Sequence, residues 1–106
     1  MAQAPISYKD PAWDAAEEAA AKRTGVPQEV LSAIRLHGER SNGDQVSPVG
    51  AKGVYQFMPA TERLFFKKYN VSAYSEDPNE QATAAAYHLK ESFNRTKDWG
   101  LAAAGY

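Results

Sequence analysis

The chain has 106 residues, of which 43% are hydrophobic and 24% charged, and its net charge is -1. This length suits one small domain spanning residues 1–106, and the composition is that of a folded globular chain. The nearly balanced charge gives no electrostatic support for nucleic-acid binding, and the absence of cysteine excludes disulfides. No apolar run approaches the roughly 20 residues that a membrane-spanning helix needs, so we expect no membrane span.

The first segment, residues 1–9, is expected to be a flexible lead-in. It has neither the basic region nor the apolar region of a secretory signal peptide. Three explanations stay open: the protein remains inside the cell, leaves by another route, or has lost a leader.

A first helix is predicted over residues 10–25. Asp10 is a favourable N-cap, Pro11 suits the first helical position, and Gly25 is a natural stop. Acidic residues precede basic ones along this segment, in the order that the helix dipole favours: Glu17, Glu18, Lys22 and Arg23.

A second helix is predicted from about Pro27 to between His37 and Glu39. Val30, Leu31 and Ile34 would share one side of it. It should end there because glycine weakens a helix and the following "SNGD" has the composition of a turn.

Three further helices are predicted over residues 60–69, 77–96 and 98–106. The middle one has apolar residues at helical spacing, which indicates an amphipathic core helix: Ala82, Ala85, Ala86, Leu89 and Phe93. The last one ends at Tyr106 while still apolar and without a stop signal, which indicates a chain cut short at its C-terminus. Residues 46–54 could hold a small ribbon at most, so the sequence predicts an all-α fold.

Glu39 is the first candidate for chemistry, because it lies at a predicted helix end before a glycine-containing loop. A carboxyl group half buried at such a place has a raised pKa and can act as a general acid near neutral pH. A lone glutamate is otherwise more often a solvated surface residue.

The loop that follows offers further candidates. Gly50 and Gly53 suggest tight or left-handed backbone, although a plain connecting loop is an equal interpretation. Gln56 lies among apolar residues, where a buried amide could orient a carboxylate or a sugar; it could equally lie on the polar side of a short helix. Ser47 fits a turn or cap residue whose hydroxyl could face a ligand.

Two histidines, His37 and His88, fit packed or surface residues better than metal ligands. They are far apart in the sequence, and no zinc-binding pattern accompanies them. We therefore expect no metal site.

The motifs, taken in order, resemble the lytic transglycosylase domain of the lysozyme-like superfamily. The matches are Glu39, "SPVGAKGVYQFMPAT" from Ser47 to Thr61, "AAAYHL" from Ala84 to Leu89, and the closing "DWGLAAAGY". They extend from about Thr24 to the last residue, and the central block is specific.

Three departures from the family pattern accompany this resemblance. The family's Glu-Ser is Glu39-Arg40-Ser41 here, in a variant that resembles versions from bacteriophage virions. His88 stands where the family has tyrosine, and the residues that follow the last tyrosine of the pattern are absent.

The resemblance implies a small lysozyme-like helical domain that cleaves the β-1,4 bond between N-acetylmuramic acid and N-acetylglucosamine. Glu39 would be the single acid and base, acting without a cofactor or metal. The residues implied to bind substrate are Ser47, Gln56, Met58 and Tyr106. The implied partner is the peptidoglycan glycan strand, and the implied place of action is the periplasm or cell wall. The protein could be delivered there by a virion or a secretion assembly, or its sequence could be a trimmed form of a longer chain.

Two rival functions stay open on the same residues. A hydrolytic lysozyme would need a positioned water, and Asp44 is the nearest second carboxylate in the sequence. Its Asn-Gly-Asp setting favours a structural role in a turn. The other rival is a non-catalytic peptidoglycan-binding or virion module, because fold alone does not establish activity.

Overall fold

The structure is a computed structural model that describes residues 5–106. Within these residues it contains no strand, and β pairing is limited to two isolated bridges, Val46–Lys52 and Lys52–Phe57. The prediction of an all-α fold is therefore confirmed. The helices are α1 (Ala12–Thr24), α2 (Gln28–Ala33), the π-helix η1 (Ile34–Glu39), α3 (Pro59–Tyr69), α4 (Pro78–Thr96) and α5 (Trp99–Ala104).

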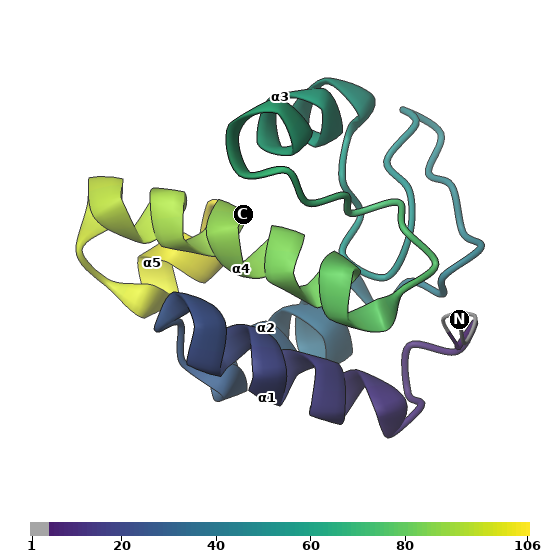
Figure 1. The fold of residues 1–106 in the computed structure, drawn as a ribbon, viewed down its shortest axis with the longest axis horizontal. Coiled ribbons are helices and arrows are strands. Elements are labelled where there is room, and N and C mark those ends of the chain that lie inside the picture. Colours follow the sequence, from purple (N-terminus) through teal and green to yellow (C-terminus); the bar gives the residue numbers. More distant parts are fainter. Residues whose placement is uncertain (1–4) are drawn as a thin grey trace.

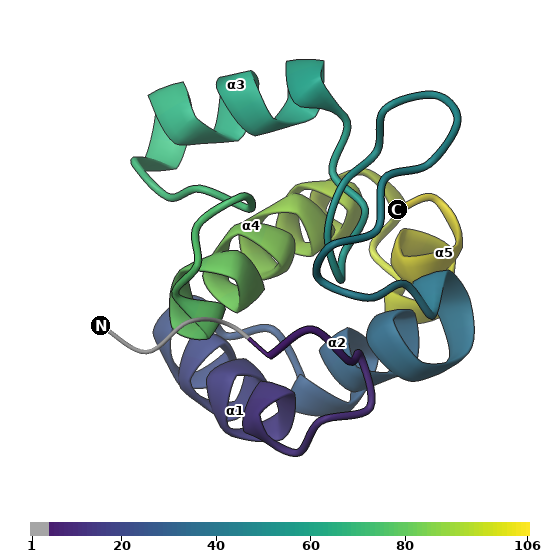
Figure 2. The ribbon, with the colours of Figure 1, turned by 90° about the vertical axis from the view of Figure 1, so that its right-hand side faces the viewer.

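The helices are arranged in two parts (Figures 1 and 2). Helices α1, α2, α4 and α5 form the lower part, while α3 and the long loop before it lie above them. Helix α4 packs most extensively against α1 and then against α5, and its contact with α3 is smaller. In both views the C-terminus lies at a height between α3 and α5. The last residue, Tyr106, is half-buried there.

Capping residues set the helix ends close to the predicted positions. The Asp77 carboxylate accepts a hydrogen bond from Asn79 N at the start of α4, and Asp98 accepts one from Leu101 N in α5. Helix α1 begins at Ala12, whose backbone N donates to Asp10 Oδ1 at 2.9 Å. It stops at Gly25, which has a left-handed φ of 81°.

Helix α4 is buried more completely than an amphipathic helix would be. Four of the five predicted core positions are fully buried, and Phe93 is half-buried against Trp99, with ring centroids 4.0 Å apart. Four residues outside the predicted stripe are buried as well: Gln81, Thr83, Ala84 and Ser92. Helix α1 covers one side of α4, and the loop and α3 cover another. The small alanine side chains of α4 let these elements approach it closely.

The two neighbouring glutamates of α1 lie in different surroundings, which the order of charges in the sequence did not predict. Glu18 and Lys22 form an exposed ion pair of 3.3 Å, as the order of charges suggests. Glu17 does not lie on that surface: its exposed fraction is 0%, and it faces the core. It shares this face with the apolar residues at helical spacing: Trp13, Ala16 and Ala20.

Residues 1–4 of the predicted lead-in lie outside the described residues. Residues 5–9 follow, and two of them are hydrogen-bonded to the segment after η1. Ile6 O accepts a hydrogen bond from Gly43 N at 2.6 Å, and Tyr8 N donates to Asn42 Oδ1 at 3.2 Å. None of the helices in residues 5–106 has the length and apolar composition needed to cross a membrane.

Candidate active site

Glu39 is the last residue of the π-helix η1. Arg40 N donates to Arg35 O at 3.2 Å, which is the five-residue spacing of a π-helix, and Arg40 itself is left-handed with φ 48°. The predicted helix end near Glu39 is confirmed, while the π form was not predicted. A π segment holds an extra residue in the turn and changes the direction of the side chains at its end, and such segments are frequent at functional sites.

The Glu39 carboxyl group is an acid that keeps its proton more readily than an ordinary glutamate. The residue is exposed as a whole, but neighbouring protein atoms remove part of the hydration of the carboxyl group. This desolvation disfavours the ionised form and raises its pKa. The shift is in the direction that favours a general acid.

Tyr106 lies close enough to Glu39 for the two groups to interact electrostatically. Burial of the phenol, together with the negative charge of Glu39, raises the Tyr106 pKa well above its ordinary value. Its hydroxyl oxygen is buried and has no hydrogen-bond partner among the described residues. The fold has thus brought two of the predicted site residues together from distant parts of the chain.

His88 is packed in the aromatic cluster that supports Tyr106. The ring centroids of His88 and Tyr106 are 4.5 Å apart, and Phe57 and Phe65 each lie 5.2 Å from the His88 ring. Burial, aided by the positive charge of Arg95, lowers the His88 pKa although Glu91 opposes this. The prediction of a packed histidine is confirmed for His88, and its surroundings disfavour the protonated imidazole.

The glycine-containing loop is closed on itself by hydrogen bonds. Gly50 and Gly53 have φ values of 91° and 86°, so the left-handed conformation predicted for them is confirmed. Ser47 N donates to Ala51 O at 2.7 Å, and Ala51 N donates to Ser47 Oγ at 3.0 Å. The Ser47 hydroxyl therefore closes the turn as an acceptor and keeps its own hydrogen to donate.

Gln56 lies in a turn, so the interpretation that it lies on the polar side of a short helix is wrong. Its φ of 51° is unusual for a residue with a side chain, and such backbone occurs preferentially at functional sites. Its Nε2 donates to Gly53 O at 2.8 Å and to Gln45 O at 3.2 Å. This fixes the amide and leaves Oε1 without a hydrogen bond among the described residues. Met58, 39% exposed, follows at the N-cap of α3.

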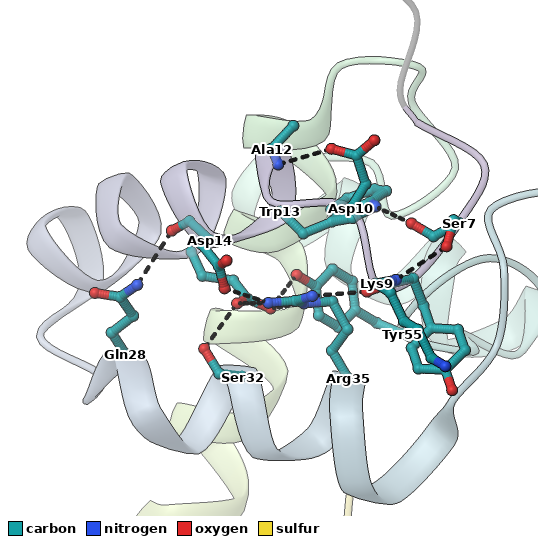
Figure 3. Close-up of polar contacts among 12 residues, drawn as sticks. Ser7, Lys9, Asp10, Ala12, Trp13, Asp14, Gln28, Ser32, Arg35 and Tyr55 are labelled. Atoms are coloured by element: carbon teal, nitrogen blue, oxygen red, sulfur yellow. Dashed lines mark hydrogen bonds and ion pairs between the residues drawn. The ribbon is translucent and has the colours of Figure 1, made fainter.

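A buried network that the sequence did not predict joins α1, η1 and the loop (Figure 3). Arg35 Nε lies 2.9 Å from Glu17 Oε2, and the Tyr55 hydroxyl donates to the same oxygen at 2.7 Å. All three side chains are at most 2% exposed. The available signal was Glu17 itself, a charged residue at helical spacing within the apolar face of α1.

Asp44, the second carboxylate considered for a hydrolase, lies in a turn. Gln45 N closes this turn by donating to Asn42 O at 3.0 Å. Asp44 lines a pocket of about 350 Å³ whose lining residues do not include Glu39: Ile6, Gly43, Asp44, Lys52, Tyr74, Ser75, Glu76 and Gln81. Among residues 5–106, no three histidine or acidic side chains gather in a way that could hold a metal ion.

The comparison with family models identifies the family of the chain. A model described as the transglycosylase SLT domain matches residues 15–106. The chain belongs to this family. The search of curated proteins and the search of solved structures each returned no match.

Membership in the SLT family confirms the lysozyme-like, mainly helical fold expected from the motifs. It also establishes the general class of activity, which is transglycosylase action of the lytic type on peptidoglycan. The matched range contains every residue that the sequence analysis placed in the site.

The raised pKa of Glu39 predicts a pH effect on this SLT domain. In the folded chain the carboxyl group should titrate above the ordinary glutamate value of 4.5, and in the unfolded chain close to it. Because the folded state holds the proton more tightly, ionisation of Glu39 should destabilise the fold as pH rises through the two values. Carbon NMR of the Glu39 carboxyl group, in buffer and in urea, measures both. A folded-state midpoint at or below the urea value would contradict the expected desolvation.

Proposed function

We propose that this SLT domain cleaves the N-acetylmuramic acid–β-1,4–N-acetylglucosamine bond of peptidoglycan and forms a 1,6-anhydromuramyl product. In this proposal Glu39 is the only protein acid and base. The observation that carries it is the Glu39 carboxyl group, which ends a helix, has a raised pKa and lies near the buried Tyr106 phenol.

In the first step the protonated Glu39 donates its proton to the glycosidic oxygen, and the bond between that oxygen and the muramyl anomeric carbon breaks. The N-acetylglucosamine strand leaves with the proton as its new hydroxyl group. The acetamido oxygen of the muramyl residue bonds to the positive anomeric carbon, a form of substrate assistance that replaces a second protein carboxylate.

In the second step the ionised Glu39 accepts the proton of the muramyl 6-hydroxyl. The 6-oxygen attacks the anomeric carbon and closes the 1,6-anhydro ring, and the bond to the assisting acetamido oxygen breaks. Glu39 returns to its protonated state, so no water, cofactor or metal is consumed. The desolvation that raises the Glu39 pKa favours both steps, because it favours the protonated acid that donates in the first step and is regenerated in the second.

Four other residues are proposed to contact the glycan. Gln56 offers a fixed amide oxygen that can accept from a sugar hydroxyl or amide, and the Ser47 hydroxyl can donate. The Met58 side chain, two residues after Gln56 in the sequence, is an exposed apolar surface suited to an N-acetyl group or a sugar face. Tyr106 is proposed to bound the site beside Glu39.

The substrate implies a place of action in the periplasm or cell wall. A virion or a secretion assembly is the proposed vehicle, on the basis of the sequence resemblance alone. Both parts of this proposal concern the setting and leave the chemistry at Glu39 unchanged.

Mass spectrometry of the fragments released from purified peptidoglycan tests the reaction. The expected products are muropeptides one water lighter than those of a hydrolase, because the ring closes on its own hydroxyl. They should be absent when Glu39→Gln replaces the wild type, since glutamine cannot donate the first proton.

Two other outcomes would overturn the proposal in different ways. Products with free reducing ends would establish a hydrolase and direct attention to a water-activating carboxylate such as Asp44. Binding to peptidoglycan with no released fragments would instead establish a binding module.

A further inference from the structure

The buried pair of Glu17 and Arg35 connects the two parts of the chain that carry Glu39 and Gln56. Glu17 is on α1, and its two carboxylate oxygens each lie 2.9 Å from a different nitrogen of Arg35. The exposed fractions of these side chains are 0% and 1%, so the pair is shielded from water. A two-point contact of this kind fixes orientation as well as distance, because the guanidinium group is planar.

Arg35 ties this pair to the helix of the proposed acid. It belongs to η1, and its backbone oxygen accepts the hydrogen bond from Arg40 N that closes the last turn around Glu39. The same residue thus holds the helix end through its backbone and the buried network through its side chain. A rotation of η1 that moved Glu39 would have to break the contact with Glu17.

Tyr55 ties the pair to the loop. Its hydroxyl donates to Glu17 at 2.7 Å, and its ring packs edge-on against Trp13 with centroids 5.9 Å apart. It directly precedes Gln56, whose left-handed backbone and doubly bonded amide leave little freedom of their own. The position of the Gln56 amide therefore depends on where Tyr55 is held.

A third connection runs to the segment after Glu39. Arg35 Nη1 donates to Tyr8 O at 2.6 Å, and Tyr8 N donates to Asn42 Oδ1 at 3.2 Å. Arg35 is therefore connected to the chain on both sides of Glu39, through η1 before it and through Tyr8 after it. Figure 3 shows Arg35 extending from its helix with Ser32 on one side and Tyr55 on the other.

The choice of charged residues for this place requires an explanation beyond stability. A buried ion pair generally adds little net stability over well-packed apolar side chains of the same volume, because both charges lose their hydration. Its advantage is directional, since only one arrangement satisfies every donor and acceptor. Resting on the proposed function, we propose that Glu17, Arg35 and Tyr55 form a positioning clamp that fixes Glu39 relative to Gln56 for glycan cleavage.

Tyr55→Phe tests the clamp, because it removes one hydroxyl and keeps the buried ring. The matched control is Ser32→Ala, which also removes a hydroxyl donor from the Glu17 carboxylate, at 2.9 Å. Ser32 lies on α2 and belongs to neither η1 nor the loop. Both variants should lower the melting temperature, since each takes a hydrogen bond from a buried carboxylate.

The two variants should differ in catalysis, measured on peptidoglycan at a temperature where both are fully folded. We expect Tyr55→Phe to lower kcat on the order of tenfold with KM nearly unchanged, because small displacements of reacting groups are costly. Ser32→Ala should keep the wild-type kcat. Equal kcat values for the two variants, in an active protein, would overturn the clamp.

A second measurement separates failure of the clamp from failure of the proposed function. If the wild type cleaves no glycan, the proposed function fails, and the NMR titration midpoint of the Glu39 carboxyl group still tests the clamp. Tyr55→Phe should move this midpoint because the surroundings of Glu39 change, and Ser32→Ala should not. The same midpoint in both variants and the wild type would overturn the clamp without any reference to activity.

Discussion

Replacing Glu39 with glutamine should lower kcat/KM for peptidoglycan cleavage by about 10²- to 10⁴-fold, the contribution typical of a positioned acid and base. Glutamine keeps the size of the side chain and cannot donate or accept the proton. The fold should not suffer, because Glu39 is exposed and its ionised form is disfavoured by desolvation. At neutral pH we therefore expect Glu39→Gln to be at least as stable as the wild type, measured by thermal unfolding.

The matched control for this variant is Asp44→Asn, the same chemical change in the turn that follows. Asp44 should be dispensable if substrate assistance replaces a second carboxylate. We expect it to keep most of the wild-type rate. A loss as deep as that of Glu39→Gln would contradict the single-acid mechanism and support a hydrolase that uses both groups.

Replacing Arg35 with methionine should destabilise the fold by about 3–5 kcal/mol, the cost of leaving a buried charge without its partner. Glu17 would lose both guanidinium contacts in a place with no access to water. Denaturant unfolding gives the free energy directly.

The control for Arg35→Met is Lys22→Met, which removes one partner of the exposed Glu18 pair at 3.3 Å. That change should cost less than about 1 kcal/mol because water screens and solvates the remaining charge. A double variant, Glu17→Met with Arg35→Met, should recover part of the loss since no buried charge is left unpaired, while Asp14, which also contacts Arg35, is exposed. A double variant no more stable than Arg35→Met would show that the loss comes from packing and not from the buried charge.

Much of the helical framework could be predicted because its signals act within a few residues. Asp77 and Asp98 cap the helices that follow them, and Gly25 ends the first helix through a left-handed φ. The turns at Gly50 and Gly53 were predicted for the same reason, since only glycine adopts that backbone without strain. The block from Ser47 to Thr61, which follows Glu39, was the specific part of the resemblance to the transglycosylase family, and the family match confirms that family.

Other predictions missed because they depended on distant parts of the chain. The burial of Glu17 requires that Arg35 and Tyr55 lie opposite it. The order of charges along α1 contains no information about the position of Arg35 or Tyr55. Gln56 was assigned equally to a helix because the hydrogen bonds that hold it, to Gly53 O and Gln45 O, form only when the loop closes.

The sequence by itself determined where helices begin and end, which glycines turn the chain, and which glutamate stands before the loop. These are local properties, decided by caps, backbone preferences and periodicity. The tertiary structure alone decided that η1 takes the π form, that Tyr106 lies close to Glu39, and that the Glu17–Arg35 pair is buried. The physical reason is that desolvation and pairing of charges depend on which groups become neighbours, and only the packed fold brings those groups together.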